Sequence, residues 1–199
     1  HLMISWFFIG MVVTILLTPG PTNTLLASSG IQVGIRKSFA LIPAEALGYF
    51  ISISLWGLII GTVSKQFPSI PVILKLFSAG YILFLALKLW RTANHDEDFN
   101  QASIRARELF VATLLNPKAL LFASAIFPPY VWVNASAYVS HMLVFLLLIL
   151  PIAFFWTFIG SVLCSNKVSW LSQSKMQRTA SLVLVSFTVP LSYSALLSL

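Results

Sequence analysis

Residues 15–27 read ILLTPGPTNTLLA, and residues 111–123 read VATLLNPKALLFA. In each stretch an apolar run is interrupted by proline and then resumes, at Thr18-Pro19-Gly20-Pro21 and at Asn116-Pro117-Lys118. Proline inside a helix removes a backbone donor and clashes with the carbonyl group four residues earlier. A capping residue precedes a proline at both breaks, so we expect a helix to restart there, with Pro19 and Pro117 at its first position.

The composition around these breaks is that of an integral membrane protein. Of the 199 residues, 58% are hydrophobic and only 9% are charged, whereas soluble domains carry about 25% charged residues. A chain this apolar cannot cover a globule with polar groups, which excludes a soluble enzyme, a disordered regulator and a nucleic-acid-binding domain. The net charge of +7 is therefore interpreted as a signal of membrane topology.

Six apolar segments are long enough to cross a bilayer, which requires about 20 apolar residues. They cover approximately residues 4–29, 38–63, 70–90, 109–127, 138–164 and 179–197. The breaks fall in the first and fourth segments, and Pro117 lies 98 residues after Pro19. Because each half has three segments, the second half enters the membrane from the opposite side.

We therefore expect an all-α integral membrane protein with six transmembrane helices, built as two inverted three-helix repeats with broken first and fourth helices. Residues 3–90 form the first repeat, residues 91–108 a cytoplasmic linker loop, and residues 109–199 the second repeat of a single membrane domain.

Lysine and arginine are concentrated after the first, third and fifth segments. These residues are Arg36, Lys37, Lys88, Arg91, Arg105, Arg107, Lys167, Lys175 and Arg178. The loop after the second segment has only Lys65, and the loop after the fourth has none. Positively charged loops usually remain in the cytoplasm, so we expect both termini to lie on the outer face.

The two breaks are a candidate substrate site. At 1.5 Å per residue, Pro19 lies about 22 Å from the outer start of its segment, and Pro117 lies about 12 Å from the inner start of its own segment. Because these distances are measured from opposite faces of the membrane, the two prolines lie close to the same level within the hydrocarbon layer. Each restarted helix directs the positive end of its dipole to that depth, where it attracts an anion such as a carboxylate. The freed carbonyl groups could hold a cation, and an amino acid carries both charges. The alternative is a pair of proline kinks that only shape the bundle.

Two charged residues lie deep in their segments. Glu45 is about 10 Å into the second segment, and Lys118 is as deep as the break that it follows. Such residues usually face the protein interior and mark a transport pathway. Glu45 is a carboxyl retained for packing, a proton acceptor, or a contact for a substrate ammonium group. Lys118 extends toward the cytoplasmic headgroups, or it pairs with a substrate carboxylate or with Glu45.

These motifs together resemble the lysine exporter (LysE/RhtB) superfamily of bacterial amino-acid exporters. The resemblance covers nearly the whole chain, and its most specific parts are the two proline blocks in this order. The matching residues are Thr18-Pro19-Gly20-Pro21 with Asn23, Gly34, Arg36, Lys37, Gly48, Gly80-Tyr81-Ile82 with Lys88, Asn116-Pro117-Lys118-Ala119 and Phe127-Pro128. The chain differs at Thr22, where the family often has asparagine, and at Pro43-Ala44-Glu45, where small residues are usual.

The resemblance implies export of amino acids or related small metabolites across the bacterial inner membrane, by proton antiport with alternating access. The predicted substrate-binding residues are Thr18, Pro19, Gly20, Pro21, Asn23, Asn116, Pro117 and Lys118. Glu45 is predicted to contact the ammonium group or to carry the coupled proton. The alternatives are a transporter of another substrate, such as a metal cation, and a non-coupled channel.

We expect no enzyme activity, because the chain has one cysteine, Cys164, and three scattered histidines. No catalytic residue, metal site or cofactor is expected either. The expected partners are an amino acid, protons and the lipid bilayer, with a homodimer left open and nucleic acid excluded.

Overall fold

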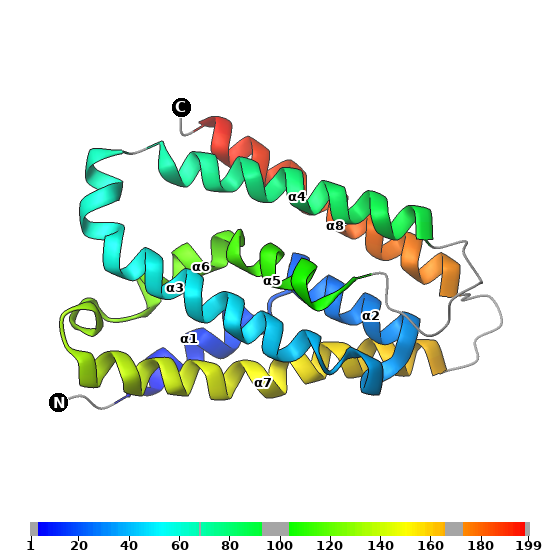
Figure 1. The fold of residues 1–199 in the computed structure, drawn as a ribbon, viewed down its shortest axis with the longest axis horizontal. Coiled ribbons are helices and arrows are strands. Elements are labelled where there is room, and N and C mark those ends of the chain that lie inside the picture. Colours follow the sequence, from blue (N-terminus) through cyan, green and yellow to red (C-terminus); the bar gives the residue numbers. More distant parts are fainter. Residues whose placement is uncertain (1–3, 68, 93–103, 166–172, 198–199) are drawn as a thin grey trace.

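The computed structural model describes residues 4–67, 69–92, 104–165 and 173–197. Throughout these ranges the regular structure is helical (Figure 1). The elements are α1 (Trp6–Leu17), α2 (Pro21–Ser38), α3 (Leu41–Gln66), α4 (Ile70–Thr92), α5 (Ala106–Leu114), α6 (Pro117–Leu121), the π-helix η1 (Phe122–Ile126), the 3-10 helix η2 (Pro129–Trp132), α7 (Ala135–Ser165) and α8 (Gln173–Leu197).

Several of these helices are long and apolar enough to cross a membrane. The helices α3, α7 and α8 meet this criterion alone. The pairs α1 with α2 and α5 with α6–η1 meet it together, each as one bent unit, with bends of 56° and 44°. The predicted all-α membrane protein is therefore confirmed, and the predicted breaks in the first and fourth segments are present.

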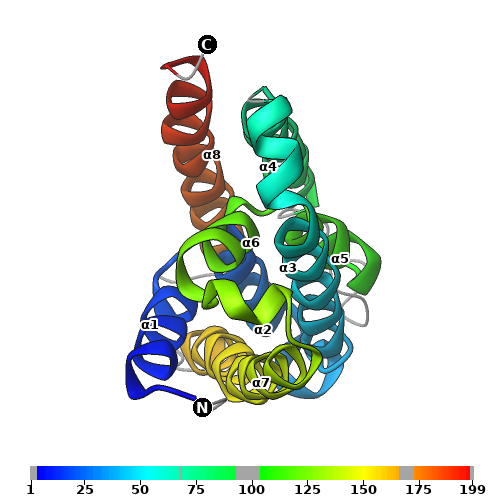
Figure 2. The same ribbon diagram turned by 90° about the vertical axis from the view of Figure 1, so that its left-hand side faces the viewer.

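The most extensive packing is within three pairs of helices. The helix α2 lies along α7, α3 lies along α5, and α4 lies along α8. The pair α4–α8 rises above the rest of the bundle when the molecule is viewed from its end (Figure 2). Each pair joins one helix from the first half of the chain to one from the second half, so neither half forms a compact unit alone.

Two apolar clusters fill the interior. One includes Phe8 of α1, Tyr49 of α3, Phe122 of η1 and Phe145 of α7. The rings of Tyr49, Phe122 and Phe145 contact one another edge to face, with centroids 5.0–5.9 Å apart. The other cluster joins α2, α4, α5 and α8. Edge-to-face ring contacts stabilise a core beyond the area they bury.

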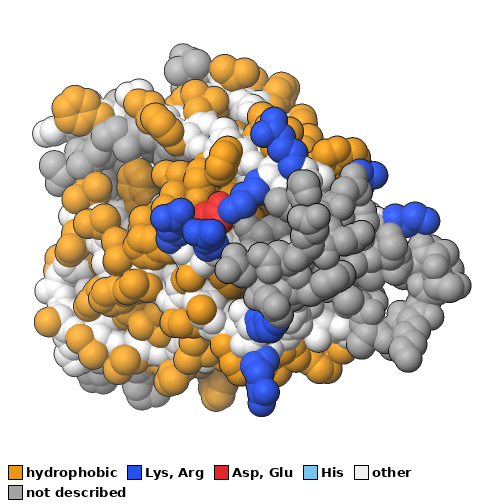
Figure 3. Space-filling model, turned by 45° about the vertical axis from the view of Figure 1, so that its right-hand side comes forward, with side chains coloured by type: hydrophobic (Ala, Val, Ile, Leu, Met, Phe, Trp, Pro, Cys, Tyr) orange, Lys and Arg blue, Asp and Glu red, His pale blue; other side chains and the backbone are white. Residues whose placement is uncertain are grey.

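Charge is concentrated at one end of the bundle. The helix α1 begins and α8 ends at the left of Figure 1, whereas the ends that carry Arg36, Arg91, Arg105 and Arg178 lie at the right. On the face drawn in Figure 3, several lysine and arginine side chains surround an acidic side chain and others lie apart from it, with apolar side chains over much of the remaining described surface.

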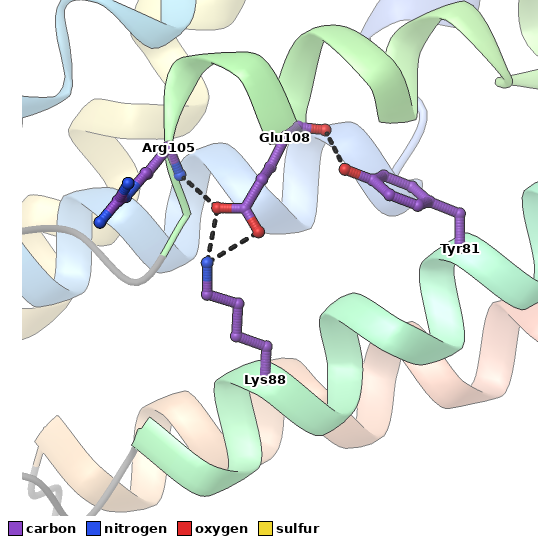
Figure 4. A network of polar contacts seen from close by, with 4 residues as sticks. All are labelled: Tyr81, Lys88, Arg105 and Glu108. Carbon is purple, nitrogen blue, oxygen red and sulfur yellow. Dashed lines mark hydrogen bonds and ion pairs between the residues drawn. The ribbon is translucent and has the colours of Figure 1, made fainter.

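A polar network joins α4 to the start of α5 at this charged end (Figure 4). The Lys88 ammonium donates to both carboxylate oxygens of Glu108, at 2.6 and 2.7 Å. The same carboxylate accepts the backbone N–H of Arg105, the cap residue at the start of α5, at 3.0 Å. The hydroxyl of Tyr81 donates to the Glu108 carbonyl oxygen at 3.1 Å. The network holds α4 against the start of α5. This is the end of the broken fourth segment that the sequence predicts to lie in the cytoplasm.

The helices extend beyond two of the boundaries expected from the sequence. The first segment extends beyond the predicted residue 29, because α2 runs on past it, but the helix is interrupted at Gly34, where φ is 83° and ψ is 178°. Arg36 and Lys37 follow this interruption, in the short last turn that ends at Ser38. At the predicted linker 91–108, α4 extends to Thr92 and α5 begins at Ala106. The remainder of that linker, residues 93–103, lies outside the described residues.

Candidate functional site: a pocket between the two helix breaks

The first break differs in detail from its prediction. Thr18 ends α1, because its backbone N–H still donates to the carbonyls of Thr14 and Ile15. The helix restarts one proline later than expected, with Gly20 as the cap and Pro21 at the first position of α2. The prediction of a restart at Thr18-Pro19 was therefore wrong. Pro19 serves instead as the connecting residue that cannot extend the hydrogen bonds of α1, since it has no N–H.

The second break agrees with its prediction. Asn116 caps α6, and its side-chain oxygen accepts the N–H of Lys118 at 3.0 Å. Pro117 occupies the first helical position, where the missing N–H has no cost. The restarted helix passes into the π-helix η1, which is closed by a bond from the Phe127 N–H to the Phe122 carbonyl at 2.8 Å. Such π-helical turns are frequent at functional sites.

The two breaks meet at one pocket. Its volume is about 270 Å³, close to the lower end of the ~300–1,000 Å³ that is usual for small-molecule sites. The lining residues are Pro19, Gly20, Pro21, Asn116, Pro117, Lys118 and Pro190. Most of the predicted substrate-binding residues thus line a single pocket, although they come from segments about 100 residues apart. Thr18 and Asn23 are not among the lining residues.

The carbonyl groups at the end of α1 receive hydrogen bonds from outside that helix. The side-chain amide of Asn23 donates to the carbonyls of Leu16 and Thr18, both at 2.9 Å. The ammonium group of Lys118 donates to the carbonyls of Ile15 and Thr18, at 3.2 and 3.0 Å. Carbonyl groups in the last turn of a helix lack the usual helical partner, and none can come from lipid. The two side chains therefore satisfy the carbonyls of Leu16 and Thr18, and Lys118 adds a second donor to the Ile15 carbonyl, which also accepts the Thr18 N–H.

A buried polar cluster lies beside the pocket. Glu45 and Tyr49 are four residues apart on α3, so they share a face, and they are only 2% and 1% exposed. The amide of Asn116 donates to the Tyr49 hydroxyl at 3.3 Å, and the side chain of Thr22 forms a further hydrogen bond with Tyr49. One carboxylate oxygen of Glu45, Oε2, is buried without a hydrogen-bond partner. The cluster connects α2, α3 and the second break.

Glu45 and Lys118 do not form an ion pair. Their charges are near enough to interact electrostatically. Among the residues that the structure describes, however, the salt bridge is formed by Lys88 and Glu108. Lys118 extends to the α1 carbonyls instead. In the same part of the chain, no three His, Cys, Asp or Glu side chains come together in a way that could hold a metal ion.

The sequence prediction missed two residues of this region. Tyr49 could have been found from its position one helical turn after Glu45. Pro190 lines the pocket from α8, where its place inside an apolar helix was the only signal.

Comparison with known proteins finds a translocator family and several efflux proteins. The family model described as LysE type translocator matches residues 13–195. A homoserine/homoserine lactone efflux protein of Salmonella typhimurium is 30% identical over 137 residues, which cover 64% of this chain and 65% of that protein. A cysteine/O-acetylserine efflux protein of Salmonella choleraesuis is 28% identical, with 61% and 62% covered. A leucine efflux protein of Klebsiella pneumoniae is 27% identical, with 62% and 61% covered.

The match spans slightly less than two thirds of the length of each of these relatives. No solved structure matches the chain.

Proposed function

Because this chain belongs to the family of LysE-type translocators, we propose that it exports amino acids or related small metabolites from the cytoplasm, by proton antiport with alternating access. The observation that carries the proposal is the pocket between the two helix breaks, lined by both Pro19-Gly20-Pro21 and Asn116-Pro117-Lys118. The relatives named above supply the substrate class, since their names describe efflux of homoserine, leucine and cysteine.

The substrate carboxylate is assigned to the start of α2. This helix begins at the pocket with Gly20 as its cap, so no side chain of the cap residue occupies the first N–H groups. A helix start attracts anions through these groups and through the helix dipole. At the start of α6 the corresponding position is already partly satisfied, because Asn116 accepts the N–H of Lys118. Lys118 lines the same pocket and supplies a positive charge.

The proposed architecture is six transmembrane helices in two inverted repeats, 3–90 and 109–199. A two-fold axis that relates the halves would exchange the first segment with the fourth and the second with the fifth. It would therefore map a contact between the first and fifth segments onto a contact between the fourth and second. Whole segments pack in this reciprocal way, because α1 and α2 of the first segment contact α7, and α5, α6 and η1 of the fourth segment contact α3. The pair α4–α8 would map onto itself. This reciprocal packing supports the repeat.

The proposed orientation places the charged end in the cytoplasm of a bacterium, with the chain in the inner membrane and both termini outside. It rests on the basic residues at the ends of α2, α4, α5 and α8, since cytoplasmic loops carry an excess of lysine and arginine.

Glu45 is proposed to carry the coupled proton. It is a buried carboxyl group within a membrane-spanning helix, and it has one unpartnered oxygen beside the pocket. Glu45→Gln keeps the shape of the side chain but cannot release a proton, so we expect export driven by a pH gradient to fall to the rate without a gradient. Counterflow exchange of labelled for unlabelled substrate should continue in the same vesicles. Full pH-driven export by this variant would remove the coupling role.

The matched control is Glu108→Gln, the same chemical change in a carboxylate that lies outside the pocket and pairs with Lys88. This variant should keep the dependence on the pH gradient, even where its rate is lower.

The test of export itself uses proteoliposomes preloaded with a labelled amino-acid mixture, with and without an imposed proton gradient. The proposal predicts saturable release of a subset of the amino acids, faster when the gradient is present. Release that does not saturate and ignores the gradient would indicate a channel. Folded protein that releases no amino acid would refute the proposal and direct the search to metal cations.

A further inference from the structure

A cluster of backbone oxygens at the end of α1 lies beside the pocket between the breaks, within reach of the Lys118 side chain that lines it. The carbonyls of Ile15, Leu16 and Thr18 accept hydrogen bonds from side chains of other elements, and the Ile15 carbonyl also accepts the backbone N–H of Thr18 at 3.3 Å. Because the peptide dipoles of a helix add up, this end also carries the negative pole of α1. The oxygens therefore form a binding site for a cation or for a group with several N–H donors.

Asn23 and Lys118, the two side chains that donate to these oxygens, differ in how firmly they are held. Asn23 lies in the first turn of the next helix and is 3% exposed, so its amide is fixed by the local fold. Lys118 extends from the other broken helix on a flexible stem, and it lines the open pocket. A lysine ammonium is a compact charge with three rotatable donors, which are the same donors that the α-ammonium of an amino acid carries.

We propose that the carbonyl oxygens of Ile15 and Thr18 are the ammonium subsite for the amino-acid substrate, and that the Lys118 ammonium occupies this subsite while the pocket is empty. The inference rests on the proposed function and adds the subsite to it. When substrate enters, its ammonium takes over the two hydrogen bonds to the carbonyls, and the displaced Lys118 pairs with the carboxylate of the same substrate.

The exchange avoids a large electrostatic cost. Inside a membrane protein, an unpaired charge or an unsatisfied carbonyl is expensive. With Lys118 as the resident cation, the carbonyls are satisfied before and after binding, and the number of positive charges that face them does not change. The substrate carboxylate then compensates the charge of Lys118. This arrangement selects molecules that carry an ammonium and a carboxylate group together.

Gly20 is the residue that permits this position of Lys118. A Cβ atom at Gly20 would lie 3.1 Å from Nζ and 3.4 Å from Cε of Lys118, which is tighter than usual van der Waals contact. The neighbour that must yield, by a few tenths of an ångström, is the end of a flexible side chain, so alanine at position 20 would push Lys118 away from the carbonyls without disturbing the backbone. Gly20→Ala thus offers an independent way to weaken the hold of Lys118 on the subsite.

The test measures binding of a simple amine to the purified protein. Methylammonium chloride is titrated into wild-type protein and into Lys118→Met, and the unfolding temperature in detergent reports binding. Tetramethylammonium chloride, which has no N–H donor, controls for ionic strength. We expect the half-saturating methylammonium concentration to be at least about tenfold lower in Lys118→Met, because apparent affinity falls with the fraction of protein whose subsite is open.

Three further variants test whether the change in methylammonium binding comes from the position of the Lys118 ammonium group. Gly20→Ala should gain methylammonium binding as Lys118→Met does, and it keeps the test valid if the latter does not fold. Lys118→Arg keeps a cation on the carbonyls and should bind methylammonium no better than wild type. Lys88→Met, which removes a lysine from the network with Glu108, should also behave as wild type.

Equal methylammonium binding in wild type, Lys118→Met and Gly20→Ala would overturn the subsite. The readout requires no transport, so this failure is separate from a failure of the export assay.

Discussion

Replacing Gly160 with alanine is expected to destabilise the folded protein by about 3 kcal/mol, at the upper end of the usual cost of overpacking. A Cβ atom at Gly160 of α7 would lie 2.0 Å from the carbonyl oxygen of Ala27 in α2. The reverse contact is as close, since a Cβ atom at Gly30 of α2 would lie 2.1 Å from the carbonyl oxygen of Thr157 in α7. Backbone atoms cannot rotate away, so α2 and α7 would have to separate.

Close approach of this kind is the usual role of small residues between membrane helices. Because α2 begins at the pocket, its separation from α7 would also reduce export. The matched control is Gly10→Ala in α1, where the added Cβ would meet no atom within 4 Å. Thermal unfolding of both variants in detergent checks the prediction. If Gly160→Ala is as stable as Gly10→Ala, α2 and α7 do not pack in this way.

Asn23→Ala is expected to destabilise the protein by about 1–3 kcal/mol, which is the cost of one buried polar group left unsatisfied. The Asn23 amide is the side-chain donor to the Leu16 carbonyl, and it shares the Thr18 carbonyl with Lys118. The Thr18 carbonyl would keep Lys118, but the Leu16 carbonyl would lose its side-chain donor and could find no other in lipid. The break between α1 and α2 would therefore lose its geometry, and export should fall with stability.

Thr24→Ala is the control for this variant. The Thr24 hydroxyl donates to the Gly20 carbonyl at 2.9 Å, but the same carbonyl also accepts the backbone N–H of Thr24. Removing the hydroxyl leaves the carbonyl satisfied, so the unfolding temperature should change little. If Asn23→Ala and Thr24→Ala unfold at the same temperature, the amide of Asn23 does not support the break.

Much of the architecture follows from the sequence, because long apolar runs and proline within them have strong physical consequences. The helical membrane class and the breaks in the first and fourth segments are confirmed. The depth argument also placed the two breaks at one level, and the structure brings Gly20 and Asn116 to the same pocket. The restart at Pro19 was wrong because Thr-Pro-Gly-Pro contains two candidate prolines, and the bonds of Thr18 to α1 decide between them.

The contacts of the deep polar residues could not be predicted in the same way. The sequence left open whether Lys118 meets Glu45, a substrate or the headgroups. The choice depends on where the α1 carbonyls lie relative to a side chain about 100 residues away, and helical periodicity carries no information on this. Tyr49 was missed for a related reason, since an aromatic residue on a buried face is usually a core residue, and only its bond to Asn116 links it to the pocket.

The most direct test of the central claim is whether an exported amino acid protects the pocket between the breaks from alkylation. The single native cysteine, Cys164, is first replaced by alanine, and a new cysteine is placed at Pro190, which lines the pocket. A second protein carries cysteine at Arg36, which is exposed at the end of α2. The rate of reaction with a water-soluble maleimide is measured as the concentration of exported amino acid rises. The account predicts that the amino acid slows the reaction at position 190, with half-protection near the concentration that half-saturates export, and leaves position 36 unchanged. An unchanged rate at position 190, or equal slowing at both positions, would contradict it.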